Sequence, residues 1–279
     1  MNEGDYLLSV NDRAVRAPEN VFAAFVGTAG KATRIAVGSA PDDKKPRTYV
    51  VTPIASEQSL RYTAWVEANR EKVAKATDGR VAYIHVPNTA MAGIQEFTKQ
   101  FYPQSDKSGI IVDERFNGGG FIPDFFVERL ARRTWSYWST RDGGDYRTPG
   151  TSIDGPKCIL VNQYAGSGGD AFPYYFRLAG LGPIIGMRTW GGLVGISHSL
   201  PLVDGGAVTM PDFGMWDAKS GEWAVENHGV DPDIEVENPP DALVAGRDPQ
   251  LERGIQYCLE ELKAHPPIKP PRPKYKTQG

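Results

Sequence analysis

Several features that mark other classes of protein are scarce in this sequence of 279 residues. The two cysteines, Cys158 and Cys258, are too few for a disulfide framework or a zinc set, and we expect no metal. No run approaches the roughly 18 to 20 apolar residues of a membrane-spanning helix, and the acidic start lacks the apolar stretch of a signal peptide. With 31 Lys+Arg against 34 Asp+Glu, the charge gives no case for binding nucleic acid or an anionic membrane. We therefore expect a cytoplasmic protein with reduced thiols.

Glycine and proline are abundant instead. The 31 glycines and 22 prolines are about 19% of the chain, against roughly 12% in average proteins, so we expect a loop-rich mixed α/β protein. Short apolar runs predict strands at 6–10, 33–37, 47–52, 81–86, 109–113, 157–162, 183–186 and 207–210. Helical spacing predicts helices at 59–76, 92–101, 125–132 and about 170–178, and a buried helix at 21–26. The alternation of strand and helix from 81 to 190 favours a layered α/β domain.

The composition divides the chain into three parts. Residues 1–56 hold a strand, a helix and two more strands, which is small for an independent core. Residues 57–264 form the main domain. Residues 265–279 contain five prolines and no apolar periodicity, so we expect a disordered tail.

Two glycine-rich turns follow buried strands and could carry chemistry. They are Asn117-Gly118-Gly119-Gly120 and Ala165-Gly166-Ser167-Gly168-Gly169. Glycine amides at a helix start could place two N–H donors on one developing oxyanion, with Ser167 as the nucleophile where strand passes into helix. Asp170, at the expected helix start, is a further candidate. The alternative is that both turns are tight connections with an incidental serine, because Ala165 breaks the G-x-S-x-G spacing.

A serine nucleophile also needs a base. No lysine lies between Lys157 and Lys219, so a histidine is the remaining option. Of the four histidines, His85 lies in an apolar strand and is best interpreted as a core residue, His198 has no obvious orienting acid, and His265 is in the tail. His228 lies close to Glu226, and in an extended segment residues two apart point the same way, although a plain surface loop explains that run equally well.

Four segments together resemble one family. They are Arg115–Gly120, Tyr164–Asp170, Arg188-Thr189-Trp190-Gly191-Gly192 and Glu226–Asp233, in this order. They look like the core of tricorn-type serine peptidases, relatives of the carboxy-terminal processing proteases. The front end, Glu3–Asn11, resembles the second half of a PDZ domain. The resemblance covers nearly the whole chain except the tail.

The resemblance implies a fold and a set of roles. It implies a crotonase-like ββα core from about residue 80, preceded by a partial PDZ domain. It implies Ser167 as nucleophile, oxyanion stabilisation by the Gly168 amide and by the Gly118–Gly120 loop, and Glu226 in the charge relay. It also implies short peptides as substrates, no cofactor, and a cytoplasmic homo-oligomer, often a hexamer.

One departure concerns the general base. In tricorn-type enzymes the catalytic histidine precedes the PDZ domain, and it has no counterpart in these 279 residues. We therefore expect a C-terminal piece of a larger peptidase that hydrolyses peptides poorly by itself.

Three alternatives remain at this point. The chain could be a self-contained hydrolase that uses Ser167 and His228, with Asp204 or Asp231 orienting the imidazole. It could be an acyl-thioester enzyme, although no basic cluster near either turn suits the phosphates of a coenzyme. It could also be a non-catalytic peptide-binding scaffold.

The cleavage preference stays open at this stage. In the family a preference for basic residues depends on an acidic group from a neighbouring subunit. The corresponding stretch here, 135–140, is aromatic and uncharged, which makes an apolar or aromatic preference as plausible, whereas Asp142 and Asp145 keep the basic option open.

Overall fold

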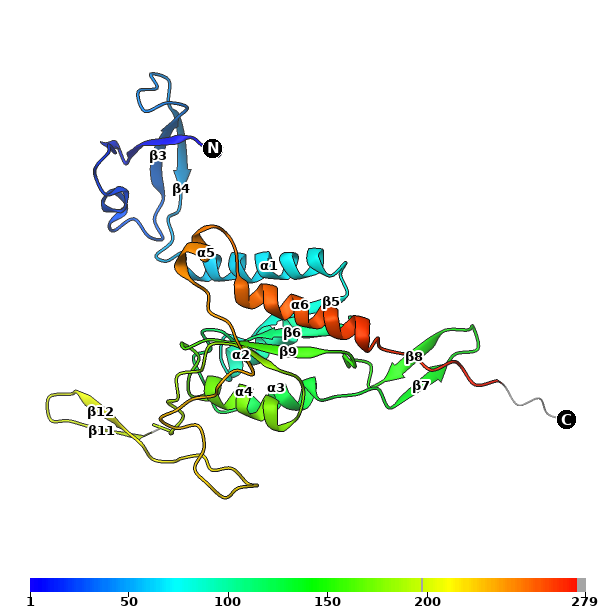
Figure 1. The fold of residues 1–279 in the computed structure, drawn as a ribbon. Helices are drawn as coiled ribbons and strands as arrows, with labels where there is room; N and C mark the ends of the chain where they lie inside the picture. Colours follow the sequence, from blue (N-terminus) through cyan, green and yellow to red (C-terminus); the bar gives the residue numbers. More distant parts are fainter. Residues whose placement is uncertain (197, 275–279) are drawn as a thin grey trace. The chain divides into compact units, whose positions relative to one another are not determined.

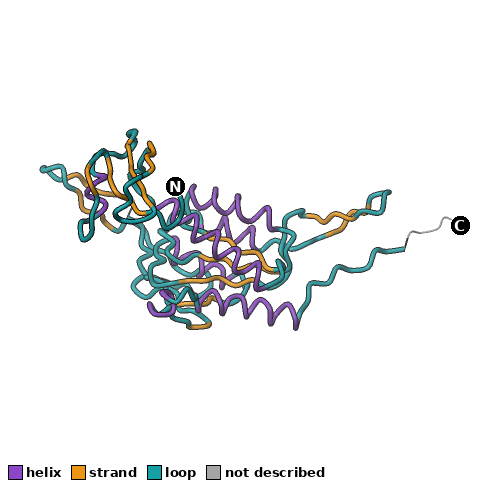
Figure 2. The backbone as a smooth tube through the Cα atoms, turned by 90° about the horizontal axis from the view of Figure 1, so that it is seen from above, coloured by secondary structure: helices purple, strands orange, loops and turns teal. Residues whose placement is uncertain are grey.

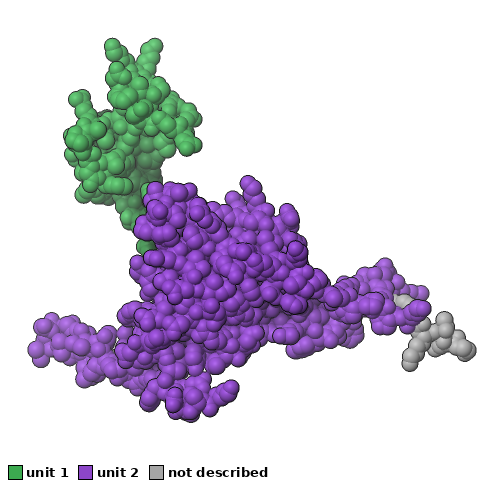
Figure 3. Space-filling model, in the orientation of Figure 1, with its two compact units in different colours: residues 1–65 green, residues 66–279 purple. Residues whose placement is uncertain are grey.

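The structure is a computed structural model that describes residues 1–196 and 198–274. It contains two compact units, Met1–Trp65 and Val66–Gly279, which Figure 3 colours separately. The boundary falls inside helix α1 (Gln58–Ala76), whose buried side chains are Val66, Asn69 and Val73. None of the helices in the described part of the chain has both the length and the apolar character needed to cross a membrane.

The first unit is an antiparallel sheet in the order β2-β1-β3-β4. Its strands are β1 (Tyr6–Val10), β2 (Arg13–Ala14), β3 (Thr33–Gly38) and β4 (Arg47–Val51). The expectation of a buried helix at 21–26 is wrong: Val21–Phe25 forms a short 3₁₀ helix with no buried residue. The core of this unit is Val10, Ile35 and Val37, and it is small enough that Ala24 and Phe25, which pack against it, are only partly buried.

The second unit is built on a five-stranded sheet in the order β13-β10-β9-β6-β5, in which every pair of neighbours is parallel. The strands are β5 (Val81–His85), β6 (Gly109–Asp113), β9 (Lys157–Val161), β10 (Ile184–Gly186) and β13 (Ile234–Glu235). All residues of β5, β6, β9 and β10 are buried, which explains their unbroken apolar runs. The predicted mixed α/β fold with buried strands is confirmed.

Helices cover both faces of this sheet (Figures 1 and 2). On one face lie α2 (Met91–Phe101), α3 (Pro123–Leu130) and α4 (Gly168–Leu178), which bury Phe97, Phe126 and Phe172 in the main core. On the other face lies α6 (Pro249–Ala264), where Gly254 approaches Ile111 and Leu160 closely. Two shorter helical segments, Tyr102–Gln104 and α5 (Pro240–Val244), complete the helices of this unit in the described residues.

Two hairpins extend from the second unit (Figure 1). One pairs β7 (Ser136–Ser139) with β8 (Asp145–Thr148), and the other pairs β11 (His198–Pro201) with β12 (Ala207–Met210). A disordered tail was expected over 265–279. Residues 265–274 leave α6 as a segment without helix or strand, and they contact the β7–β8 hairpin. Residues 275–279 lie outside the described part of the chain.

Candidate active site

The two glycine-rich turns meet because they follow neighbouring parallel strands. β6 and β9 pair directly, so their carboxyl ends lie at the same edge of the sheet. The amide of Gly166 donates to the carbonyl of Asn117 at 3.1 Å. A Cβ atom added to Gly119 would lie 2.7 Å from the Cβ of Ser167, closer than real Cβ contacts come. The structure therefore places the first turn directly against the serine of the second.

The three glycines of the first turn differ in what their amides do. The N–H of Gly118 donates to the carbonyl of Pro87 at 3.0 Å, and the N–H of Gly119 donates to the Asn117 side chain at 2.9 Å. The N–H of Gly120 forms no hydrogen bond within the described residues. Of this turn, only the Gly120 amide is therefore available to a ligand, while the other two amides shape the turn.

Ser167 is held in an unusual backbone conformation. Its φ is 57° and its ψ is −119°, a backbone conformation that residues other than glycine rarely adopt. Strained backbone of this kind is concentrated at functional sites. Its N–H donates to the Asp170 side chain at 2.7 Å. The residue is half-buried and lines two cavities, so its hydroxyl side is not enclosed by packing.

Gly168 is the first residue of α4, and its amide also forms no hydrogen bond within the described residues. A Cβ at this position would lie 1.9 Å from the Oγ1 of Thr89 and 2.3 Å from the carbonyl oxygen of Gly120. Only glycine allows this close approach. The arrangement leaves two unoccupied N–H groups, those of Gly120 and Gly168, on neighbouring turns beside Ser167, and the helix N-terminus adds positive potential.

Asp170 joins the serine turn to a third segment. Its buried carboxylate accepts hydrogen bonds from the Oγ1 of Thr189 at 2.6 Å and the amide of Gly191 at 2.8 Å, besides that of Ser167. Burial raises the pKa of Asp170, and the hydrogen bonds from Thr189, Gly191 and Ser167 oppose that rise. The carboxylate thus fixes the turn around Ser167, and both of its oxygens accept hydrogen bonds from the protein.

Glu226 lies at the same cavity as Ser167. One carboxylate oxygen, Oε2, accepts from the amides of Leu193 and Val194 at 2.7 and 2.6 Å. Ser167, Glu226, Val194 and residues 190–192 are among those that line one cavity of about 450 Å³. The structure therefore brings these two predicted site residues to one cavity.

Ser167 also lines a second cavity, of about 660 Å³. Its side chains are almost all apolar: Phe121, Pro123, Ala171, Tyr175, Leu193, Val194, Ile196, Phe213 and Met215. No charged side chain of the described residues lines it. Such a cavity suits an apolar group of a ligand next to the serine.

The histidines lie in different surroundings. His85 is buried, its ring pairs with the carbonyl of Arg115, and burial lowers its pKa, as expected of a core residue. The Nε2 of His228 pairs with Asp231 at 2.7 Å, and His228 does not line either cavity beside Ser167. His265 pairs with Glu261. Only the backbone of His198 is described, at the start of β11.

The acids proposed to orient His228 also differ. Asp231 contacts its imidazole, whereas the Asp204 carboxylate accepts from Gly206 in the turn between β11 and β12. Among the described residues, no group of three or more His, Cys, Asp or Glu side chains could hold a metal ion. Both cysteines are buried free thiols.

Two residues of the site were missed by the sequence analysis, Thr89 and Glu114. Thr89 is fully buried beside Gly120 and Gly168, and its hydroxyl has no hydrogen-bond partner within the described residues. Both carboxyl oxygens of buried Glu114 likewise lack a partner there. Burial, and then the charges of Asp170 and Asp113, raise the pKa of Glu114 well above its usual value. Glu114 could have been found from the sequence, because it is an acid that directly follows a buried strand. Nothing in the sequence marked Thr89.

Comparison with known proteins identifies the family of the chain. Peptidase family S41 matches residues 80–236, more than half of the chain. The tricorn protease of Thermoplasma acidophilum is 38% identical over 269 residues, which are 96% of this chain and 25% of that protein. The putative Tricorn-like protease C-terminal subunit of Sulfurisphaera tokodaii is 40% identical over 219 residues, 78% of this chain and 26% of that protein.

The solved crystal structure of the tricorn protease has the same fold. It superposes with a TM-score of 0.85 at 37% identity, over 93% of this chain and 25% of that chain. This chain thus spans about a quarter of the length of the relatives named here. The resemblance to tricorn-type peptidases is confirmed, and the chain belongs to Peptidase family S41.

Proposed function

We propose that this chain carries the nucleophile and the oxyanion site of a serine peptidase that hydrolyses short peptides. The observation that supports this most is the position of Ser167, strained and open to two cavities beside the unoccupied amides of Gly120 and Gly168. Ser167 Oγ attacks the scissile carbonyl and gives up its proton to a base. The Gly168 amide, at the N-terminus of α4, and the Gly120 amide, in the first turn, stabilise the negative oxygen of the tetrahedral intermediate.

Glu226 belongs to the charge relay in this proposal, as the resemblance implies. Its Oε2 is fixed by two amides at the cavity edge, which leaves Oε1 to orient a partner. The proposal places the general base on a histidine upstream of these residues, because the three described imidazoles are engaged elsewhere. A cytoplasmic homo-oligomer, often a hexamer in the family, and a partial PDZ domain over residues 1–56 with a crotonase-like core are parts of the same proposal.

A fluorophosphonate probe and a fluorogenic peptide assay test this proposal. We expect labelling at Ser167, abolished in Ser167→Ala, and slow hydrolysis that rises by orders of magnitude in a longer version of the chain that carries the upstream histidine. Labelling that persists in Ser167→Ala would refute the role of Ser167. A self-contained hydrolase instead predicts full activity of this chain and its loss in His228→Ala, which the proposal expects to be without effect.

The apolar cavity supports a preference for an apolar or aromatic side chain at the cleavage site. Met215 lines it with its sulfur 3.2 Å from the Tyr175 hydroxyl. We expect substrates with Phe or Leu to exceed those with Lys in kcat/KM by about 10- to 200-fold, since burying one apolar side chain is worth roughly 1–3 kcal/mol.

Met215→Glu should reverse that preference towards Lys. Met210→Glu is the matched control, because it adds the same charge to an exposed residue of β12 that does not line the cavity. If both variants change the ratio equally, the cavity does not hold the substrate side chain.

A further inference from the structure

A single carboxylate on the β7–β8 hairpin receives two cations from the C-terminal segment. Asp145 Oδ2 lies 2.7 Å from Lys269 Nζ, and its Oδ1 lies 2.6 Å from Arg272 Nη2. The Asp145 side chain is 13% exposed with the segment in contact, and it also accepts from Ser139 Oγ at 2.7 Å. Both of its oxygens are therefore paired with a cation.

The proline content of the C-terminal segment explains why both cations reach the same carboxylate. Residues 266–273 contain five prolines, at 266, 267, 270, 271 and 273. Proline fixes φ near the polyproline II value, and that helix has three residues per turn. Lys269 and Arg272, three apart, therefore fall on one side of the segment, and both reach Asp145.

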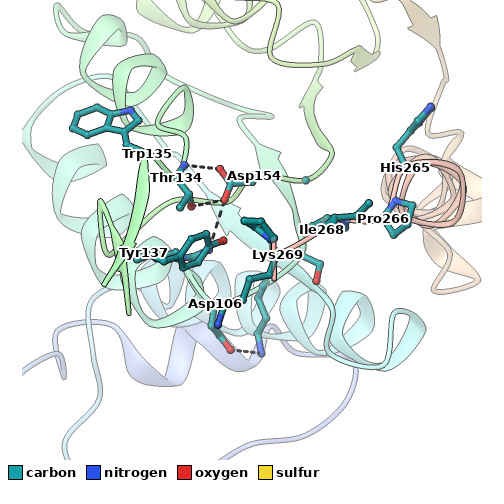
Figure 4. A pocket seen from close by; sticks show the side chains of 15 residues that line it. Asp106, Thr134, Trp135, Tyr137, Asp154, His265, Pro266, Ile268 and Lys269 are labelled. Atoms are coloured by element: carbon teal, nitrogen blue, oxygen red, sulfur yellow. Dashed lines mark hydrogen bonds and ion pairs between the residues drawn. The ribbon is translucent and has the colours of Figure 1, made fainter. Parts of the chain in front are cut away.

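The hairpin contributes more than the carboxylate. The Lys269 ammonium lies 5.3 Å from the ring centroid of Tyr137, within the range of a cation–π contact. Arg272 also donates to the carbonyl of Gly143 in the hairpin turn at 2.6 Å. Figure 4 shows Lys269 beside Tyr137, in a cavity of about 710 Å³ that the hairpin and the segment line together. Proline-rich segments are commonly bound by grooves lined with aromatic side chains.

The contacts with the segment also change the electrostatics of the hairpin. The hydrogen bond from Lys269, then those from Ser139 and Arg272, lower the pKa of Asp145. The hairpin is two strands that pair with no other strand of the described residues, and such a ribbon is marginally stable alone. The segment therefore supplies the hairpin with a third element to pack against.

We propose that the β7–β8 hairpin is a recognition site for a basic proline-rich segment with two cations three residues apart, and that residues 266–273 of the same chain occupy it. Asp145 binds both cations, and Tyr137 binds the first. The C-terminal segment is thus a docked ligand that holds the hairpin in place.

Peptide binding to the full chain tests this. In the double variant Lys269→Glu/Arg272→Glu the chain's own segment cannot pair with Asp145, so the site becomes free. A fluorescent peptide of residues 264–274 should bind this variant, measured by fluorescence anisotropy. It should bind the parent chain at least tenfold more weakly, because the tethered segment competes at a high effective concentration. Adding Asp145→Asn to the double variant should weaken binding at least tenfold.

The matched control is a peptide with Ile268 and Lys269 exchanged, which keeps the composition but sets the cations four apart. Equal binding of both peptides, or equal binding with and without Asp145→Asn, would overturn the proposed recognition site. It would mean that the peptide binds through general charge attraction alone. A parent chain that is dimeric and becomes monomeric in the double variant would show that a second copy's segment fills the site, which would overturn docking within one chain.

Discussion

The carboxyl group of Glu114 makes a sharp prediction about stability and pH. It is completely buried, both of its oxygens lack a hydrogen-bond partner in the described part of the chain, and its pKa is raised well above 4.5 by burial and by the charges of Asp170 and Asp113. The native protein therefore keeps this proton at pH values where the unfolded chain, with an ordinary glutamate, has lost it.

The sign and size of the effect follow from that difference. Above pH 4.5 the unfolded state binds fewer protons than the native state, so the free energy of unfolding falls as pH rises, until the native-state pKa is reached. The slope is about 1.4 kcal/mol per pH unit. Glu114→Gln has a similar shape and does not titrate. Its free energy of unfolding relative to the parent should therefore rise between pH 5 and pH 7, by at most about 1.4 kcal/mol per pH unit.

Urea unfolding at pH 5, 6 and 7, followed by tryptophan fluorescence, measures this difference. Contributions of all other titrating groups are shared by the two proteins and cancel in the comparison. Glu128→Gln makes the same change on an exposed side chain of α3 and should stay within about 0.5 kcal/mol of the parent. A difference between Glu114→Gln and the parent that stays constant from pH 5 to 7 would refute the neutral, buried acid.

Two further predictions concern the turns at Ser167. Gly168→Ala forces a Cβ to within 1.9 Å of Thr89 Oγ1 and 2.3 Å of the Gly120 carbonyl oxygen. We expect this variant to lose fluorophosphonate labelling and to be destabilised by about 1–3 kcal/mol in urea unfolding. Unchanged labelling would contradict the close approach of the two turns. Thr89→Val removes a buried hydroxyl that has no partner in the described residues and keeps the shape of the side chain. The free energy of unfolding, measured by thermal unfolding, should therefore rise by about 1 kcal/mol. A fall of that size would mean that the hydroxyl forms a hydrogen bond.

Much of the main domain could be predicted from local patterns. The parallel strands are buried on both faces, and their unbroken apolar runs are visible in the sequence. Helix α6 was not predicted, although Leu251, Cys258 and Leu262 recur at helical spacing. The segment 21–26 shows the opposite error, because apolar composition does not determine how large the neighbouring core is, and that core buries Ala24 and Phe25 only partly.

The sequence alone determined that two glycine-rich turns follow buried strands and that a serine lies in one of them, since these depend on residues close together in the chain. Only the tertiary structure decided which amides stay free. The amide of Gly119 is occupied locally by the Asn117 side chain, but that of Gly118 is occupied by the carbonyl of Pro87, about 30 residues earlier, and that of Gly120 is left free of a partner in the described residues. It likewise decided that Asp145 binds a segment more than 120 residues away. Hydrogen-bond partners and enclosure come from segments distant in sequence, and folding alone brings them together.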